Sequence, residues 1–312
     1  MEKLKIMKPK VLAIMGPTAS GKSKLSLELA QAFNGEIISA DSAQLYIGAD
    51  IGTAKPTAEE LAQVAHHLVN IRTLSEPQFS LAEFKQLAGA AIEDIHKRGR
   101  LPIVSGGTGL YLRGLLDGYT LIDLPPDPEL RESLNQRSLA SLLAQLVQLD
   151  PDTYAKIDRC NKRRVSRALE VVLQTGRSFS QVSRREPPNF DILKLGINIE
   201  RTTLYERIDR RCQVMLDSGW AQEVEWLKEQ GHEADLRRLH ILGYPELLDA
   251  LDGTLSLEEA GQKIRFATHR YAKRQQTWLK AETDLHKIEF GANLFSEAET
   301  LVKAWLAGQS KG

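Results

Sequence analysis

The stretch from Val11 to Leu25 reads VLAIMGPTASGKSKL and decides the fold class of the N-terminal part. Its apolar run Val11–Met15 is typical of a buried strand, and Lys22–Phe33 carries apolar residues at helical spacing. Between them the chain matches the pattern GxxxxGKS/T, formed by Gly16, Pro17, Thr18, Ala19, Ser20, Gly21, Lys22 and Ser23. Glycines let backbone N–H groups turn inward around phosphate oxygens, the lysine adds positive charge, and the serine hydroxyl can ligate Mg²⁺. The stretch therefore predicts a phosphate-binding loop between a strand and a helix.

Two further strand candidates follow along the chain, at Glu36–Ala40 and Leu101–Ser105. A helix is predicted between them over Leu81–Arg98, where Gly99 would end it. Strands that alternate with helices form a parallel sheet with crossover helices. We therefore expect an α/β fold with a P-loop NTPase-like sheet, and the run Ile192–Ile199 predicts a later strand that returns to this sheet.

The pattern changes after Asp117, where a turn-rich segment is followed by helical, leucine-rich stretches such as Ser138–Leu149 and Lys162–Gln174. The chain from Thr202 to Leu306 is mostly helical in pattern, so we expect a helical C-terminal part. The predicted domains are a helical insertion at about residues 121–180 and a core at residues 1–120 and 181–312.

Composition limits the class of protein. The 312 residues include 41 Lys and Arg and 41 Asp and Glu, so net charge does not indicate a partner. Cys160 and Cys212 lie far apart, which argues against a disulfide framework and a zinc ribbon and fits a reducing compartment. The N-terminus is too short and polar for a signal peptide, and no apolar run reaches membrane-spanning length. We expect a cytoplasmic protein without membrane contact. We also expect both cysteines to lie in the core, and His66 and His67 to occupy structural positions on a helix.

Polar residues follow the three predicted strands at their carboxyl ends. The first strand leads to the phosphate loop, the second to Asp41-Ser42-Ala43-Gln44, and the third to Gly106-Gly107-Thr108-Gly109. Ligands bind at this edge of a parallel sheet, so Asp41 and Thr108 should project beside the bound phosphate. Asp41 could serve as a magnesium partner, as a general base or as a helix N-cap, and Thr108 could be an ordinary turn residue.

Positive charge is concentrated in two segments of this neutral chain. From Lys156 to Arg211 there are 14 Lys and Arg against 7 Asp and Glu, and from Gln262 to Lys280 there are six Lys and Arg and no acid. The second segment also contains Phe266, Tyr271 and Trp278. Cations interleaved with aromatic rings suit phosphate contacts and base stacking on a polynucleotide, although a solvated helix face with core aromatics has the same pattern.

Several motifs together resemble the tRNA dimethylallyltransferase family, whose members prenylate an adenosine beside the anticodon. The resemblance extends nearly from end to end and includes no CxxC/HxxxH spacing, so it implies a bacterial-type member. The matching segments are GPTASGKS (16–23), DSAQLY (41–46), DIGTAKP (50–56), GGTGLYLRGLLDG (106–118), RRVSRALEV (163–171), LGYPELL (242–248) and AKRQQTWLK (272–280).

The resemblance implies that the phosphate belongs to dimethylallyl diphosphate. The implied reaction transfers the dimethylallyl group to N6 of an adenosine and releases diphosphate, with Mg²⁺ as cofactor. Lys22, the loop amides and Mg²⁺ would stabilise the leaving group, and Asp41 would take the proton of the amine. Thr108 is similar to a family residue that contacts tRNA near the reacting group. Arg207 and Arg211 match family arginines near the donor, and one of them should help to bind the diphosphate.

The implied partner is the anticodon stem-loop of tRNA, bound by a monomer. Its target adenosine must leave the base stack, which costs a few kcal/mol that contacts elsewhere on the RNA would offset. The residues expected to contact tRNA are Asp41, Ser42, Ala43, Gln44, Thr108, Arg131, Arg163, Arg164, Arg167, Lys273, Arg274, Gln275, Trp278 and Lys280.

Three alternative functions fit parts of the sequence. A small-molecule P-loop kinase explains the phosphate loop but leaves the acid-free segment Gln262–Lys280 without a purpose. An adenylate isopentenyltransferase would use the same donor with a free nucleotide. A P-loop regulator that binds RNA would bind tRNA without forming a covalent product.

Overall fold

The structure is a computed structural model that describes residues 8–118, 127–182 and 188–308. It divides into two compact units. We name residues 1–112 with 189–312 the core unit, and residues 113–188 the inserted unit. Each unit has a hydrophobic core of its own, and the expected insertion at residues 121–180 falls within the inserted unit.

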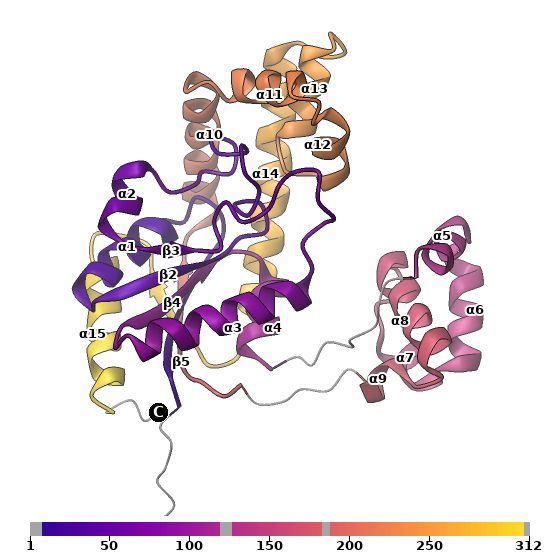
Figure 1. The fold of residues 1–312 in the computed structure, drawn as a ribbon, viewed down its shortest axis with the longest axis horizontal. Coiled ribbons are helices and arrows are strands. Elements are labelled where there is room, and N and C mark those ends of the chain that lie inside the picture. The colour runs from indigo at the N-terminus through magenta and orange to yellow at the C-terminus, as the bar shows by residue number, and fades with distance from the viewer. Residues whose placement is uncertain (1–7, 119–126, 183–187, 309–312) are drawn as a thin grey trace, which may run out of the picture. The chain divides into compact units, whose positions relative to one another are not determined.

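Among the described residues, the centre of the core unit is a parallel sheet with the strand order β3-β2-β4-β1-β5-β6 (Figure 1). Each strand pairs in parallel with its neighbours. This confirms the expected α/β fold class and the return of the later strand to the sheet. The strands are β1 (Lys10–Met15), β2 (Gly35–Ala40), β3 (His66–His67), β4 (Leu101–Gly106), β5 (Asp191–Asn198) and β6 (Leu285–Glu289).

Helices follow the strands and make up most of the C-terminal part. Several begin at capping boxes, such as Ser80 with Glu83 and Ser256 with Glu259, which satisfy the first backbone N–H groups of a helix. The helices outside the inserted unit are α1 (Lys22–Ala32), α2 (Ala58–Gln63), α3 (Leu81–Lys97), α10 (Arg201–Asp217), α11 (Trp220–Glu229), α12 (Glu233–Leu239), α13 (Tyr244–Leu251), α14 (Leu257–Lys280) and α15 (Leu294–Leu306); α4 (Gly109–Leu116) runs across the boundary between the units.

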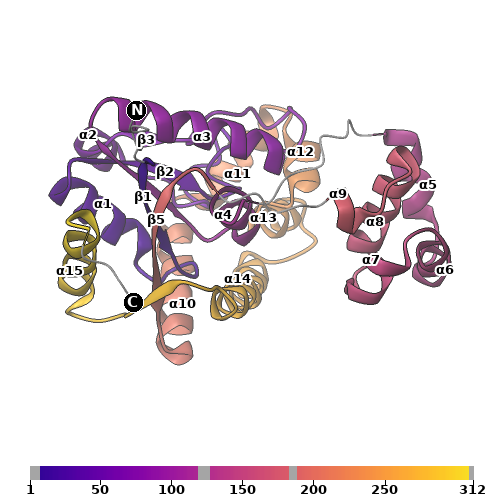
Figure 2. The ribbon, with the colours of Figure 1, turned by 90° about the horizontal axis from the view of Figure 1, so that it is seen from below.

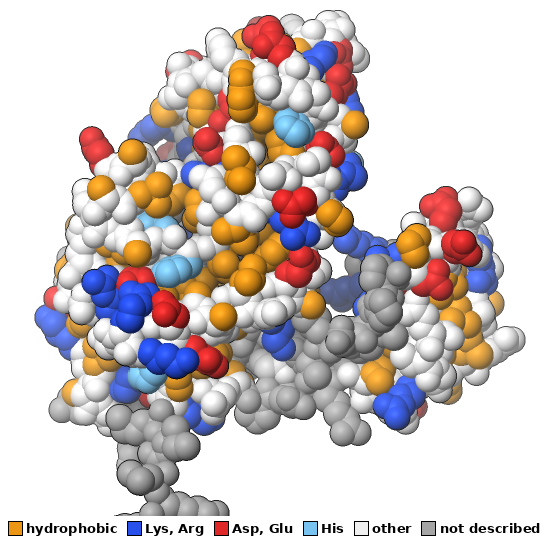
Figure 3. Space-filling model, in the orientation of Figure 1, with side chains coloured by type: hydrophobic (Ala, Val, Ile, Leu, Met, Phe, Trp, Pro, Cys, Tyr) orange, Lys and Arg blue, Asp and Glu red, His pale blue; other side chains and the backbone are white. Residues whose placement is uncertain are grey.

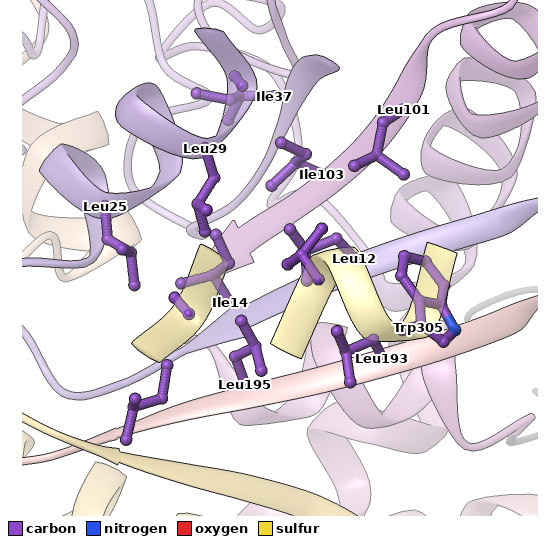
Figure 4. Close-up of a cluster of buried hydrophobic side chains, with 14 of the residues drawn as sticks. Leu12, Ile14, Leu25, Leu29, Ile37, Leu101, Ile103, Leu193, Leu195 and Trp305 are labelled. Carbon is purple, nitrogen blue, oxygen red and sulfur yellow. The ribbon is translucent and has the colours of Figure 1, made fainter. Parts of the chain in front are cut away.

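Successive side chains of a strand point to opposite faces of the sheet. Because the residues of β1 are buried on both faces, helices cover the sheet on both sides. Leu12 and Ile14 of β1 point to the same face and pack in one cluster with Leu25 and Leu29 of α1 and with Trp305 of α15 (Figure 4). Figure 2 shows α3 on the opposite side of the sheet from α15. The strand that leads into the phosphate loop is therefore enclosed by a neighbour on each side and a layer of helix on each face.

The inserted unit is a small group of helices around a leucine-rich core. Polar residues before the helices, among them Asp127, Ser138, Asp150 and Asn161, accept hydrogen bonds from first-turn N–H groups and fix where the helices begin. Its helices are α5 (Pro128–Gln136), α6 (Leu139–Leu149), α7 (Pro151–Lys156), α8 (Lys162–Thr175) and α9 (Phe179–Val182).

Two expectations about local structure are wrong. His66 and His67 form the short strand β3 beside β2 rather than part of a helix. The C-terminal part is mostly helical, as expected, and it also contributes β6, which pairs with β5. Cys212 is buried as expected, but Cys160 is exposed in the inserted unit, after α7, where a polar turn brings it to the surface.

The surface is mixed in charge. Figure 3 shows Lys and Arg side chains interspersed with Asp and Glu over the core unit, in keeping with their equal numbers in the sequence. Among the described residues, no helix has the length and apolarity that crossing a membrane requires.

Candidate active site

Three loops meet at the carboxyl edge of the sheet, as predicted. Strand β4 lies between β1 and β2, and Gly106 is in register with both Met15 and Ala40. The loops that follow are joined by hydrogen bonds, because the N–H of Thr108 donates to the carbonyl of Ala40 (3.3 Å) and the N–H of Ser42 donates to Oγ1 of Thr108 (3.1 Å). The structure thus brings Thr108 beside the segment that carries Asp41.

The phosphate loop has the backbone shape that its sequence predicts. Gly21 precedes α1 with φ of 94°, and no side chain caps the first N–H groups of that helix, so they remain directed toward a ligand. A Cβ atom on Gly16 would lie 2.7 Å from Oγ of Ser20 and 3.2 Å from Cγ of Lys22, so a larger residue there would displace these side chains. Nζ of Lys22 donates to the carbonyl of Pro17 (2.7 Å) and so folds back over the loop.

A cavity of about 910 Å³ opens beside this loop, entirely within the core unit. Lys22, Ser23, Asp41 and Arg211 contribute charge and polar atoms to its wall. Other parts of the wall are apolar or aromatic. These side chains include Phe79, Tyr111, Ile208, Met215, Trp220, Leu239, Ile241, Leu242 and Tyr271. A ligand with a diphosphate and a hydrocarbon group would find a complementary surface for each.

The charges in this cavity influence one another. Burial lowers the pKa of Lys22 to about 8, the nearby Asp41 carboxylate acts in the opposite direction, and Arg211 lowers it further. Burial also lowers the pKa of Arg211, although a guanidinium remains protonated near neutral pH. Two cations and one carboxylate therefore share a partly desolvated space, where their effect on a bound anion is stronger than in water.

The two predicted donor arginines lie in different surroundings. Arg211 lines the cavity. Arg207, one turn earlier on α10, donates from Nε to the carbonyl of Ala19 (2.8 Å) and lies over the ring of Phe290, 4.5 Å from its centroid. Arg207 thus supports the phosphate loop from outside, whereas Arg211 faces the space that a ligand would occupy.

Asp41 lies in a turn and not at the start of a helix. Its Oδ1 accepts the N–H of Ala43 (2.9 Å), which orients the carboxylate at the cavity wall. Gln44 is held from several sides, because its Oε1 accepts Oγ of Ser39 (2.8 Å) and its Nε2 donates to the carbonyl of Ala54 (3.0 Å). The segment expected to contact the base is thus rigidly tied to the sheet and to the following loop.

Helix α14 carries the predicted basic residues on its outer side. Lys273, Arg274 and Lys280 are exposed, and Arg274 also contributes to the cavity wall. Trp278 is half-buried, and a Cβ atom on Gly109 would lie 2.7 Å from its ring. Gln275 is buried between the phosphate loop and Gly107 and does not reach the surface.

The other predicted tRNA contacts lie in the inserted unit. Arg163 and Arg164 are exposed on the first turn of α8. Nε of Arg131 and Nη1 of Arg167 both donate to the buried carboxylate of Glu170, at 2.6 and 2.7 Å. These four arginines therefore share one small unit, in which a buried acid orients two of them.

Sequence reasoning missed the residues that hold the loop after Gln44. The carboxylate of Glu223 on α11 accepts the N–H groups of Asp50 (2.9 Å) and Ile51 (2.7 Å) and the hydroxyl of Tyr244 (2.6 Å). Lys55 is almost fully buried and donates to Asp50 (2.6 Å). The motif DIGTAKP marked this loop, but no local pattern connects it to a glutamate far along the chain.

A second missed cluster holds the edge of the sheet near β3. Glu36 is buried on β2 and accepts hydrogen bonds from Arg98, Arg100 (2.9 Å) and His67 (2.8 Å). Its pKa is lowered to about 2, chiefly by the Arg98 hydrogen bond. This cluster is structural, which agrees with the structural role expected of His67.

Comparison with known proteins shows the family of this chain. A family model described as IPP transferase matches residues 44–282. The chain belongs to the IPP transferase family. A tRNA dimethylallyltransferase of Thermomicrobium roseum is 47% identical over 274 residues, which cover 86% of this chain and 83% of that protein. A tRNA dimethylallyltransferase of Halalkalibacterium halodurans is 42% identical over 317 residues, which cover 98% of this chain and all of that protein.

Solved structures of the family have the same fold. The tRNA isopentenylpyrophosphate transferase of Bacillus halodurans is similar with a TM-score of 0.71 and 39% identity, over 97% of each chain. A eukaryotic dimethylallyltransferase described as acting on tRNA is similar with a TM-score of 0.85 and 30% identity, over 96% of this chain and 80% of that one. The parallel sheet and the helical C-terminal part are therefore features of the family.

Proposed function

We propose that this protein is a tRNA dimethylallyltransferase that alkylates N6 of an adenosine beside the anticodon. The observation that carries the proposal is one cavity in which Lys22 and Arg211 lie with Asp41, beside apolar and aromatic walls. A carboxylate next to a cationic diphosphate site suits a reaction in which a base removes a proton while an anion leaves. The family to which the chain belongs supports the same reaction.

In this mechanism, the donor is dimethylallyl diphosphate. Its allylic C–O bond breaks and the electron pair leaves with the diphosphate, which Lys22, Arg211 and the amides at the start of α1 stabilise. N6 of adenine forms the new C–N bond, and Asp41 accepts the proton that N6 loses. Thr108, joined to Ser42, would hold the acceptor side of the site.

The residues present fit a magnesium ion whose coordination the phosphate oxygens of the substrate would complete. Among the described residues, no group of three or more His, Cys, Asp or Glu could hold a metal by itself. Mg²⁺ commonly binds through one or two protein oxygens, phosphate oxygens and water. Ser23, on the cavity wall, would supply a protein oxygen, and the ion would neutralise charge on the diphosphate.

The RNA partner of this reaction is an anticodon stem-loop. We propose that Lys273, Arg274 and Lys280 on α14 contact its phosphates and that the exposed arginines of α8 add contacts from the inserted unit. These contacts would offset the cost of taking the target base out of its stack. We further propose that the protein acts as a monomer in the cytoplasm.

A label-transfer experiment tests this function. The protein is mixed with dimethylallyl diphosphate labelled in the hydrocarbon group and, separately, with unmodified tRNA or AMP. We expect label in tRNA at an N6-alkylated adenosine and none in AMP. Label in AMP alone would identify a free-nucleotide enzyme. Tight tRNA binding without any covalent product would refute the proposed catalysis, as would phosphate transfer from ATP to a small molecule.

A further inference from the structure

Gln275 stands out because its buried carboxamide joins two loops of the site. Its Oε1 accepts the N–H of Thr18 in the phosphate loop (2.8 Å), and its Nε2 donates to the carbonyl of Gly107 (2.9 Å). Only 3% of the residue is exposed. A buried amide is stable only when its donor and its acceptor both have partners, so the two loops and Gln275 stabilise one another.

The turn at Gly107 is shaped to receive this side chain. A Cβ atom on Gly107 would lie 2.2 Å from Nε2 of Gln275 and 3.2 Å from the carbonyl oxygen of Gly16. Gly107 therefore lies where the phosphate loop, the turn after β4 and α14 meet. Any larger residue there would push the carboxamide away from its partners.

The same face of α14 makes further contacts with the turn. Tyr271, Gln275 and Trp278 are spaced by four and three residues, which places them on one side of a helix. Trp278 packs against Gly109, and Tyr271 lies close enough to Thr108 for a polar interaction. The helix thus contacts the loop that would hold the donor and the turn that would hold the acceptor.

We propose that Gln275 is a positioning residue that fixes the phosphate loop relative to the Thr108 turn, so that the donor's allylic carbon is aligned with the acceptor nitrogen. The inference rests on the proposed function, because alignment matters only when two substrates react. It assigns Gln275 a role other than contact with tRNA. Misplacement of reacting groups by about 1 Å can slow a reaction ~100-fold while each substrate still binds.

The test is the Gln275→Leu variant, which keeps the volume and removes both hydrogen bonds together with a polar contact to Tyr271. We expect the turnover of tRNA prenylation to fall about 10- to 100-fold. The dissociation constants of dimethylallyl diphosphate and of tRNA, each measured without the other, should change less than ~3-fold, because the groups that hold each ligand remain. The matched control is Gln276→Leu, since Gln276 donates instead to the carbonyl of Ile199 (3.1 Å) and should leave turnover within about twofold.

A second variant tests the same contact from the other side. Gly107→Ala should lower turnover in the same way. The double variant Gly107→Ala/Gln275→Ala should have the same turnover as the single variant Gln275→Ala, because both changes break the same connection. If Gln275→Leu does not fold, this pair still decides. Weakened tRNA binding with unchanged turnover would make Gln275 an RNA contact, and unchanged values throughout would overturn the proposal. An inactive wild-type protein would instead refute the function on which it rests.

Discussion

The lowered pKa of Lys22 predicts how donor binding depends on pH. The cationic ammonium binds diphosphate, and burial brings its pKa to about 8 in the free protein. With that value, roughly 90% of the protein carries the cation at pH 7 and roughly 10% at pH 9. The affinity for dimethylallyl diphosphate should therefore fall about tenfold over this range, or about 1.4 kcal/mol.

Burial shifts the ionisation of two other groups in the cavity wall to higher pH. The pKa of Tyr271 is raised to about 12, chiefly by burial, and burial also raises the pKa of the Cys212 thiol. Arg211 keeps its charge. The last ionisation of a phosphate ester has a pKa of about 6, so the donor gains no charge above neutral pH.

Calorimetry without tRNA measures this effect at pH 7, 8 and 9. Binding should take up protons at pH 8 and above, because the diphosphate favours the cationic lysine and thereby raises its pKa. Lys22→Arg should bind with the same affinity at all three values, since arginine remains charged. The reasoning fails if the wild-type affinity is constant between pH 7 and 9, or if the arginine variant loses affinity to the same extent.

Three other variants test the remaining parts of the structure. Asp41→Asn should lower the turnover of prenylation by about 10²- to 10⁴-fold and leave the tRNA affinity unchanged. Steady-state kinetics measures the turnover and filter binding measures the affinity. An equal decline of both would argue against a role of Asp41 in proton removal. Replacing Lys273 and Arg274 by Gln should weaken tRNA binding and reduce the slope of log K against log salt by up to about 2; an unchanged slope would exclude phosphate contacts there. Glu36→Gln should reduce the free energy of unfolding by about 1–3 kcal/mol in a denaturant titration at pH 7. Because the pKa of Glu36 is lowered from 4.5 to about 2, this contribution should disappear as pH falls through that range, and a pH-independent difference would contradict it.

The central fold and one side of the site could be predicted because their signals are local. The phosphate loop is encoded within a few residues, and the meeting of the three loops follows from the rule that parallel strands end at one edge of the sheet. Asp41 and Thr108 could thus be placed together without knowledge of tertiary contacts.

The rest depends on contacts between distant segments. Nothing near Gln275 in the sequence shows that it faces Thr18 and Gly107 rather than solvent, because the polar side chain is typical of an exposed helix position. In the same way, Arg207 and Arg211 have similar surroundings in sequence, and only the packing of α10 separates them. Short strands such as β3 have too few residues to produce a recognisable alternation.

The position of Trp305 in the main core has a consequence for synthesis of the chain. Its ring packs in the cluster with Leu12 of β1, and the ammonium of Lys10 lies over that ring, 4.8 Å from its centroid. A ribosome that has made the first strand must therefore translate nearly three hundred more residues before this layer can close. Until then the nascent chain exposes apolar strand surface, so we expect chaperones to engage it and premature stop codons just before α15 to yield chains that proteases remove.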